Sequence, residues 1–292
     1  MKRGILLVLM LATLGLAGQA EFPSLSPTGS IEQNVGITTI SIAYERPIAR
    51  GRTIFGELVP FGTIWRTGAG NGTKIKFADA VVLGEKLIPA GQYSLFAIPN
   101  KRQWTIILNS DETIYGLEGY DETKDVIRFN TAVNIVDRYY ESFTVAIDLI
   151  NTNAELHISW ENTNISFPIM TQTDKGLMKM VNEEFLSGKV NDSDALAMGA
   201  YYYHFLNMEL KTALKLINRA IDLKKVSWYY DVKIDILTNR KQYKQALKTL
   251  KTAMGYVKTN PENWSEERQQ SVSKEQEIRK KELLSKVKDE LE

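Results

Sequence analysis

Four arginines and four aromatic residues share the stretch from Tyr44 to Thr73. The arginines are Arg46, Arg50, Arg52 and Arg66, and the rings interleaved with them are Tyr44, Phe55, Phe61 and Trp65. A guanidinium can hold a carboxylate, a phosphate or a sugar by paired hydrogen bonds, while a neighbouring ring offers a stacking surface. The stretch therefore predicts a ligand-binding loop with the candidate residues Arg46, Arg50, Arg52, Trp65, Arg66, Asn71 and Thr73.

Three glycines, Gly68, Gly70 and Gly72, stand at the end of this stretch. Glycine lets the backbone turn so that several N–H groups converge on one anion, and the glycines therefore favour an anion site. The spacing is not a dinucleotide fingerprint, because no strand–helix–strand unit surrounds it, and the Gly-Lys-Ser/Thr of a phosphate-binding P-loop is missing.

A purely structural role is the alternative for the same arginines. They would then form ion pairs that fasten a long loop, with Glu45, Glu57 or Asp125 as partners. The two interpretations differ in their prediction. A binding loop leaves guanidinium groups facing a pocket, whereas a structural loop uses all of them on protein partners.

Signals for catalysis are weaker. His157 falls on the polar side of an expected strand, opposite Asp148, and His204 lies in an aromatic helical stretch. Carboxylates are frequent near Tyr120, at Asp121, Glu122 and Asp125, so a pair of the glycosidase type is conceivable. No Gly-x-Ser-x-Gly elbow marks a serine hydrolase. A metal-independent hydrolase acting on a glycan or another envelope substrate stays open as an alternative.

Composition narrows the classes of protein. The 292 residues contain no cysteine and two histidines, so we expect no disulfide, no thiolate metal site and no bound metal or cofactor. The 36 basic and 35 acidic residues nearly cancel, which argues against a nucleic-acid partner. A content of 43% hydrophobic residues is enough to form a buried core.

The first 20 residues predict a secretory signal peptide. Lys2 and Arg3 precede an apolar run from Gly4 to Ala17, and Gly18-Gln19-Ala20 supplies the small residues of a cleavage site. The apolar run is shorter than the roughly 20 residues of a spanning helix, and no later stretch resembles one. We therefore expect a periplasmic or secreted protein with no membrane span after cleavage.

Residues 21–170 carry the pattern of short strands. This part holds most of the glycines, seven of the eight prolines, and 12 Lys and Arg against 17 Asp and Glu. Gly84-Glu85 and the Pro99–Arg102 segment predict two hairpin turns. Alternation from Ser142 to Trp160 predicts a further hairpin, turning at Thr152-Asn153, with Phe143, Val145, Ile147, Leu149, Leu156, Ile158 and Trp160 on one face. About nine strands predict an all-β domain, an antiparallel β-sandwich or an open barrel.

The remainder predicts helices. From 171 to 292 there are few helix-breaking residues, and a motif of Ala213 and Ala220 recurs 33 residues later as Ala246 and Ala253. This period is close to that of tetratricopeptide helix hairpins, which the segment resembles. We expect an all-α helical-hairpin repeat domain over 171–260, with a plain helical bundle as the alternative, followed by a charged helix over 261–292 capped by Ser265.

Several linked motifs resemble one bacterial family. They are Tyr44-Glu45-Arg46-Pro47, Gly51–Gly56, Val59–Gly62, Trp65–Ala69, Pro89–Leu95, Ile98-Pro99, Trp104-Thr105 and Asp125–Arg128. Over residues 26–169 the chain is similar to the uncharacterised family numbered 2911 among domains of unknown function. The resemblance implies an exported protein of the kind found in Bacteroidetes, often with helical repeats appended, and brings no established activity.

One departure from the family pattern falls inside the candidate loop. After Trp-Arg-Thr-Gly-Ala the family usually continues Asn-Glu-Ala-Thr, whereas this chain has Gly70-Asn71-Gly72-Thr73. The carboxylate of that motif is missing, so any role it has in relatives does not carry over.

The functional expectation that follows is an exported binding protein. The arginine-rich loop would bind a small molecule or glycan, and the helices would offer a groove to a peptide or protein partner. The hydrolase is the first alternative, and a structural envelope protein is the second. A pocket in which an arginine faces a carboxylate of raised pKa would favour the hydrolase.

Overall fold

The computed structural model describes residues 22–260 and 264–290. The predicted signal peptide, residues 1–20, lies outside these residues. The chain divides into two compact units, which we describe separately. The β unit contains the residues up to Asp148 together with Ala154–Ile169, and the helical unit contains Leu149–Asn153 and the residues from Met170 onward.

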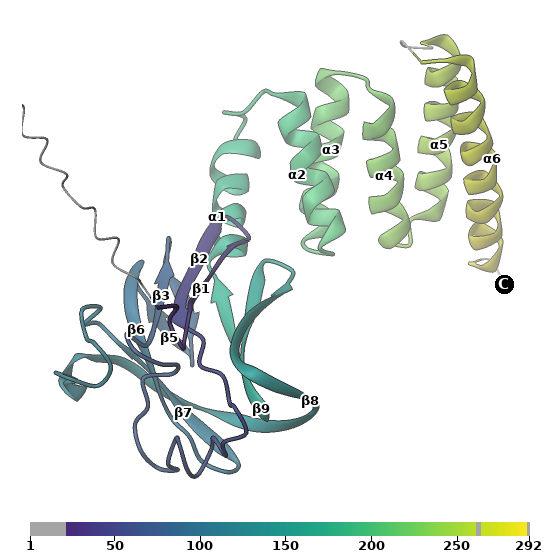
Figure 1. Cartoon of the computed structure of the whole chain (residues 1–292). Helices are drawn as coiled ribbons and strands as arrows, with labels where there is room; N and C mark the ends of the chain where they lie inside the picture. Colours follow the sequence, from purple (N-terminus) through teal and green to yellow (C-terminus); the bar gives the residue numbers. More distant parts are fainter. Residues whose placement is uncertain (1–21, 261–263, 291–292) are drawn as a thin grey trace, which may run out of the picture. The chain divides into compact units, whose positions relative to one another are not determined.

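The described residues form one antiparallel sheet of nine strands in the order β1-β2-β3-β6-β7-β8-β9-β4-β5 (Figure 1). The strands are β1 (Thr28–Val35), β2 (Thr38–Glu45), β3 (Thr73–Phe77), β4 (Val81–Leu83), β5 (Lys86–Ile88), β6 (Gly91–Ile98), β7 (Gln103–Asn109), β8 (Asp125–Ile150) and β9 (Asn153–Thr171). A short 3₁₀ helix, η1 (Glu122–Lys124), precedes β8. The all-β prediction is therefore confirmed.

The sheet is folded over one core. β2 and β5 stand near opposite ends of the strand order, yet Ile40 and Ile42 of β2 and Ile88 of β5 belong to the same buried cluster. The long strands β8 and β9 curve between the two ends of the sheet (Figure 1). When a sheet curls in this way, the apolar face of one half packs against the apolar face of the other half, and both are removed from water. This gives the two-layer packing expected of a sandwich.

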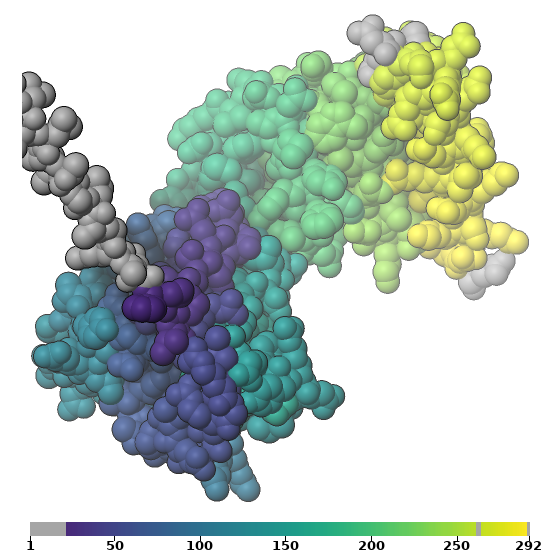
Figure 2. Space-filling view, viewed as in Figure 1, coloured from purple at the N-terminus to yellow at the C-terminus, as the bar shows by residue number. Residues whose placement is uncertain are grey.

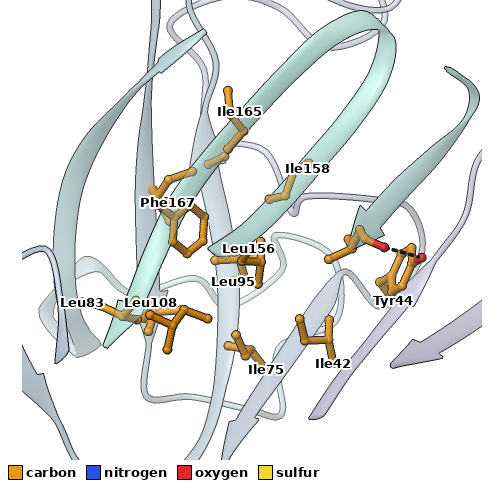
Figure 3. Close-up of a cluster of buried hydrophobic side chains, with 14 of the residues drawn as sticks. Ile42, Tyr44, Ile75, Leu83, Leu95, Leu108, Leu156, Ile158, Ile165 and Phe167 are labelled. Carbon is orange, nitrogen blue, oxygen red and sulfur yellow. Dashed lines mark hydrogen bonds between the residues drawn. The ribbon is translucent and has the colours of Figure 1, made fainter. Parts of the chain in front are cut away.

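Alternation along the strands supplies this core. In β9 the side chains of Leu156, Ile158 and Trp160 are at most 2% exposed, as the period of two requires for a strand with one buried face. Figure 3 shows Leu156 and Ile158 packed among side chains of β2, β3, β6 and β7. The hydroxyl of Tyr44 donates to the carbonyl oxygen of Val145 at 3.4 Å, which satisfies the polar tip of a buried ring.

Two details of the strand prediction were wrong. The arms of the predicted hairpin are longer than expected, because they belong to the long strands β8 and β9, which extend beyond Ser142 and Trp160. The turn itself occupies Asn151 and Thr152, one residue earlier than predicted, because Asn151 takes the left-handed conformation (φ 54°). Leu149, expected inside, is 55% exposed at the hairpin end.

The helical unit contains α1 (Thr173–Met180), a π-helical turn η2 (Val181–Phe185), α2 (Ser193–Phe205), α3 (Leu210–Leu223), α4 (Ser227–Asn239), α5 (Tyr243–Thr259) and α6 (Glu266–Asp289). The recurring alanines Ala213, Ala220, Ala246 and Ala253 are all buried on α3 and α5. Small side chains at seven-residue spacing let neighbouring helices approach closely. The predicted helical hairpins are thus present as α2–α3 and α4–α5 (Figure 1).

The last helix is capped and packed. The hydroxyl of Ser265 accepts the backbone N–H of Arg268 at 3.2 Å, as predicted for its N-terminus. Val272 and Leu283 of α6 are buried, so this charged helix has an apolar side and is more than a solvated extension. Within the described residues, no helix combines the length and apolar character needed to cross a membrane.

Candidate functional site

The connection between β2 and β3 is a long loop that follows the rim of the sheet. Short bridges hold it in place: Trp65 exchanges backbone hydrogen bonds of 2.7 and 2.9 Å with Ala97 of β6, and Ala49 donates to the carbonyl of Glu141 in β8 at 2.8 Å. These contacts satisfy backbone groups that would otherwise be buried without partners. The loop is therefore a fixed part of the β unit, which is a requirement for a preorganised site.

Aromatic rings form the base under this loop. Trp65 lies within 6.1 Å, between ring centroids, of Phe55, Trp104, Phe143 and Trp160. Most of these pairs meet edge to face, and Trp65 and Trp160 are nearly parallel at 19°. Trp65 is 8% exposed, and its indole N–H donates to the carbonyl of Gly68 at 3.1 Å. The sequence predicted a ring that offers a stacking surface to a ligand, whereas this indole packs against its aromatic neighbours and forms the floor under the loop.

A pocket of about 550 Å³ opens above this floor. That volume falls in the range of small-molecule sites. We call it the arginine pocket, lined by Leu25, Ser26, Pro47, Arg50, Arg52, Leu58, Val59, Pro60, Thr63, Ile64, Trp65, Arg66, Gly68, Ala69, Leu117 and Trp160. The structure thus brings Arg50, Arg52, Trp65 and Arg66 together, four of the seven predicted ligand residues.

Two of the pocket arginines are held by carbonyl oxygens. Arg52 donates from Nε to Ala49 at 2.9 Å and from Nη2 to Ile48 at 2.7 Å. Arg50 donates from Nη2 to Leu25 at 2.9 Å. Carbonyl partners orient a guanidinium without neutralising its charge, and several N–H donors of each group stay unused.

Arg66 differs from its neighbours. Within the described residues, no hydrogen bond or ion pair engages its guanidinium. Its Nη1 atom lies against Gly116, where a Cβ would stand only 3.0 Å away. Gly116 also has φ 64°, a conformation that favours glycine. Arg66 thus lines the pocket with a guanidinium whose donors have no protein partner among the described residues.

The structural alternative required ion pairs that the described residues do not show. None of the ion pairs found there includes Arg46, Arg50, Arg52 or Arg66, and Asp125 pairs with Arg128 instead, at 2.6 Å. The nearby carboxylates accept backbone N–H groups of the loop: Glu141 from Arg50 at 2.8 Å, and Glu161 from Ile54 at 3.1 Å. The acids therefore fasten the loop, while the guanidinium charges stay unpaired.

Left-handed backbone accompanies these contacts. Arg50 (φ 52°), Thr67 (φ 51°) and Glu161 (φ 53°) are non-glycine residues in a conformation that costs about 1–2 kcal/mol each. Strain of this kind concentrates at functional sites, where the surrounding structure maintains it. Here it turns Arg50 so that its N–H meets Glu141 while its guanidinium reaches Leu25.

Three predicted ligand residues do not line the pocket. Arg46 donates to the Phe143 carbonyl at 3.2 Å and to Thr144 Oγ1 at 3.3 Å. Thr73 is 1% exposed and donates its hydroxyl to the carbonyl of Thr67. Asn71 is exposed, and its backbone N–H is bound by Glu45 Oε1 at 3.0 Å.

The predicted nest of backbone N–H groups is also occupied by the protein itself. Besides Asn71, Gly72 donates to the carbonyl of Ala69 at 2.7 Å, and Thr73 donates to the carbonyl of Arg66 at 3.2 Å. The glycines instead permit close approach: a Cβ on Gly68 would lie 3.0 Å from the backbone oxygen of Glu45. The backbone N–H groups of Asn71, Gly72 and Thr73 are therefore already used within the protein.

Two segments of the pocket were missed by sequence reasoning. Leu25 and Ser26 come from the stretch before β1, and Leu117 comes from the loop between β7 and β8. In Figure 2 the darkest purple residues, at the start of the described chain, lie on the surface of the β unit. No motif links these segments to the arginines, because the contacts are long-range. The available signal in the sequence was a leucine with polar or glycine neighbours on both sides, as at Leu25 and Leu117.

A polar network holds the loop that carries Leu117. Asp125 accepts hydrogen bonds from Asn109 at 2.8 Å, from Tyr120 at 2.7 Å and from Arg128 at 2.6 Å. Burial and the Asp125 carboxylate raise the pKa of Tyr120 to about 12. Asp125, one of the carboxylates near Tyr120 that a glycosidase would need free, is thus engaged in holding this loop.

A Lys–Ser pair was not anticipated. β3 and β6 place Lys74 opposite Ser94, and Lys74 Nζ lies 2.8 Å from Ser94 Oγ. Burial lowers the pKa of Lys74, although Asp111 opposes this shift. Ser94 is 1% exposed and donates its hydroxyl to the Asp111 carbonyl at 2.7 Å, so substrate has no access to it. The pair is a buried structural contact.

Neither histidine is among the lining residues of the arginine pocket. His157 Nε2 is 3.3 Å from Asp148 Oδ2, the pairing expected from the strand pattern. His204 of α2 lies 3.4 Å from Asn239 of α4. Within residues 22–260 and 264–290, no three His, Asp or Glu side chains gather to hold a metal ion.

Comparison with protein families gives one match, over residues 26–169. This part of the chain is similar to the family described as "Protein of unknown function (DUF2911)". The match supports the predicted resemblance, and it covers β1 to β9 with the whole loop of the arginine pocket. No curated protein matches the chain.

Proposed function

We propose that the protein is an exported binding protein whose arginine pocket holds a small anionic ligand. The observation that carries this proposal is the free guanidinium of Arg66 beside Arg50 and Arg52, in a pocket whose described lining contains no acidic residue. Three cationic groups that no carboxylate neutralises attract an anion, and a partly enclosed wall strengthens that attraction.

The hydrolase alternative finds less support. A carboxylate general acid or base must lie within hydrogen-bond reach of the substrate, and none of the described residues lining the pocket is Asp, Glu or His. The helical hairpins, which we propose to be tetratricopeptide-like, would add a surface for a peptide or protein partner.

The test combines a ligand panel with one pocket variant. The purified protein is heated with inorganic phosphate, citrate, galacturonate, acetate or decanoate, and anions that raise the melting temperature are titrated by calorimetry. We expect at least one to bind, and Arg66→Gln to weaken it by about tenfold or more, since a hydrogen bond to a charged group contributes about 1.5–3 kcal/mol.

Arg102→Gln is the matched control. Arg102 is an exposed arginine in the turn between β6 and β7, outside the pocket lining. Its substitution removes the same charge and should leave the affinity unchanged. A panel without any stabilising anion, or equal losses in the two variants, would refute the proposal.

A further inference from the structure

The lining of the arginine pocket is unbalanced in its hydrogen-bonding groups. Its charged side chains are Arg50, Arg52 and Arg66, and Ser26 and Thr63 add two hydroxyls. Among the described lining residues there is no Asp, Glu, Asn or Gln side chain to accept from a ligand. A sugar presents many hydroxyl donors and needs such acceptors, whereas an anionic group needs only donors.

The tryptophans of the floor do not offer a stacking platform. Trp160 is 2% exposed and Trp65 is 8% exposed, and their rings lie nearly parallel with centroids 6.1 Å apart. Aromatic recognition of a ring-shaped ligand requires an open face, which these indoles have already used on each other and on Phe55 and Phe143.

Apolar side chains surround the mouth of the pocket. Leu25 is 73% exposed, Leu58 46% and Leu117 40%, and these three leucines come from three separate segments of the chain. Val59, Pro60 and Ile64 extend the same wall. Exposed large apolar residues gathered around one cavity mark a surface that a partner covers.

From this combination we infer that the ligand is an amphiphilic anion: a carboxylate or phosphate group attached to a compact hydrocarbon body. The head group would be bound by Arg66 with Arg50 and Arg52, and the hydrocarbon would cover Leu25, Leu58 and Leu117. The inference rests on the proposed function and deepens it, because it selects one chemical class among anions.

The experiment compares ligands that carry one or both features. Decanoate has the head and the body, acetate and inorganic phosphate have only the anion, octyl glucoside has the body without charge, and galacturonate is an anionic sugar. Calorimetric titration of the full-length protein should give decanoate an affinity at least about tenfold above each of the others, since burying two methylenes already provides about 1.6 kcal/mol.

Two variants distinguish this inference from the proposed function. Leu117→Ser should weaken decanoate by about tenfold and leave phosphate unchanged, whereas Arg66→Gln should weaken both ligands. Circular dichroism and the melting temperature confirm that each variant is folded, and Leu87→Ser, an exposed leucine of β5 outside the pocket, is the control.

The titrations distinguish failure of the inference from failure of the proposed function. If phosphate or galacturonate binds with the same affinity as decanoate, the proposed anion site is supported and the inference of an amphiphilic ligand is wrong. Decanoate binding that neither variant changes takes place elsewhere and overturns the inference. If no anion binds at all, both the inference and the proposed function fail.

Discussion

Individual side chains in the β2–β3 loop divide into those that hold the loop and those that face the pocket. Thr73 and Arg46 have protein partners and belong to the first group, whereas Arg66 belongs to the second. Residue type alone did not separate them, because an arginine pattern has the same appearance whether its partner is a carbonyl or a ligand. The density of arginine and aromatic residues drew attention to the loop that contributes to the arginine pocket, and long-range contacts decided which side chains line it.

Thr73→Val tests the structural role of one residue. The substitution preserves the shape but removes the hydroxyl that donates to the Thr67 carbonyl, leaving that buried acceptor unpaired. We expect urea denaturation at pH 7 to show a loss of about 1–3 kcal/mol in the free energy of unfolding. Anion affinity measured by calorimetry should stay within twofold of the unmodified protein, about 0.4 kcal/mol.

Arg66→Gln should give the reverse result, with weaker binding and little change in stability, because its guanidinium has no partner in the described structure. If Thr73→Val lowers the affinity as much as Arg66→Gln does, the distinction between residues that hold the loop and residues that face the pocket is incorrect.

At the scale of elements, local patterns predicted the hairpins well. The pair Gly84-Glu85 forms the turn between β4 and β5 with positive φ at both residues, 48° and 70°. This is the geometry expected where a two-residue turn must match the twist of its strands. Glycine adopts a positive φ without strain, whereas glutamate is strained in this conformation.

Replacing Glu85 by glycine should therefore stabilise the protein. Relief of the left-handed conformation contributes about 1–2 kcal/mol, and the greater freedom of glycine in the unfolded chain offsets part of it. We expect a net gain of about 0.5–1 kcal/mol in urea denaturation. Glu57→Gly, at an exposed position without positive φ, should not stabilise. If Glu85→Gly instead lowers the free energy of unfolding, the glutamate makes a contact that stabilises the fold by more than the strain destabilises it.

Strand boundaries were less predictable than turns. Ser142 lies opposite Ile48 in an isolated bridge, so β8 pairs with the β2–β3 loop at the point where the predicted hairpin began. The edge strand β1 and the interior strand β3 lack long apolar runs of their own. β1 takes its register from β2, and β3 takes its register from β2 and β6. Tertiary pairing overrides weak local preference in such segments.

Helices α4 and α6 meet at a charged cluster with a pH response. Asp231 lies 3.8 Å from Arg279, which also binds Asp235, with Glu275 and Arg268 nearby. Burial raises the pKa of Asp231 to about 6, although Arg279 opposes the shift. Because the folded protein binds this proton more tightly than the unfolded chain, Asp231 lowers the stability as pH rises from about 4 through 6.

Asp231→Asn removes that titration. The melting temperature of the variant, relative to the unmodified protein, should be higher at pH 7.5 than at pH 4.5. The effect will be modest, because the side chain is 45% exposed and solvent screens the charge. Asp289→Asn, an exposed residue of the same helical unit, serves as control. A pH-independent difference would show that Asp231 titrates normally.

The whole molecule contains separate cores. The two apolar clusters of the β unit share no buried residue with the two clusters of the helical unit, as the change from strand to helix pattern near residue 170 had suggested. Substitutions in distant, unconnected clusters act independently. The location of each core was thus readable from the sequence, whereas the curling of the sheet that closes the first one was not.

Leu156→Ala and Leu216→Ala test this separation, since both side chains are fully buried. Each substitution leaves a cavity and should cost about 2–5 kcal/mol. Native-state hydrogen exchange should show lost protection in β2 for the first variant and in α3 for the second. Equal loss in both units for either variant would mean that the cores unfold as one.

The stretch from Phe22 to Ser26 has a practical consequence for anyone who purifies the protein. Because the carbonyl of Leu25 holds Arg50, and Leu25 and Ser26 form part of the wall of the arginine pocket, a tag fused directly ahead of Phe22 would begin close to the pocket. Binding assays are better served by a tag placed after Glu292.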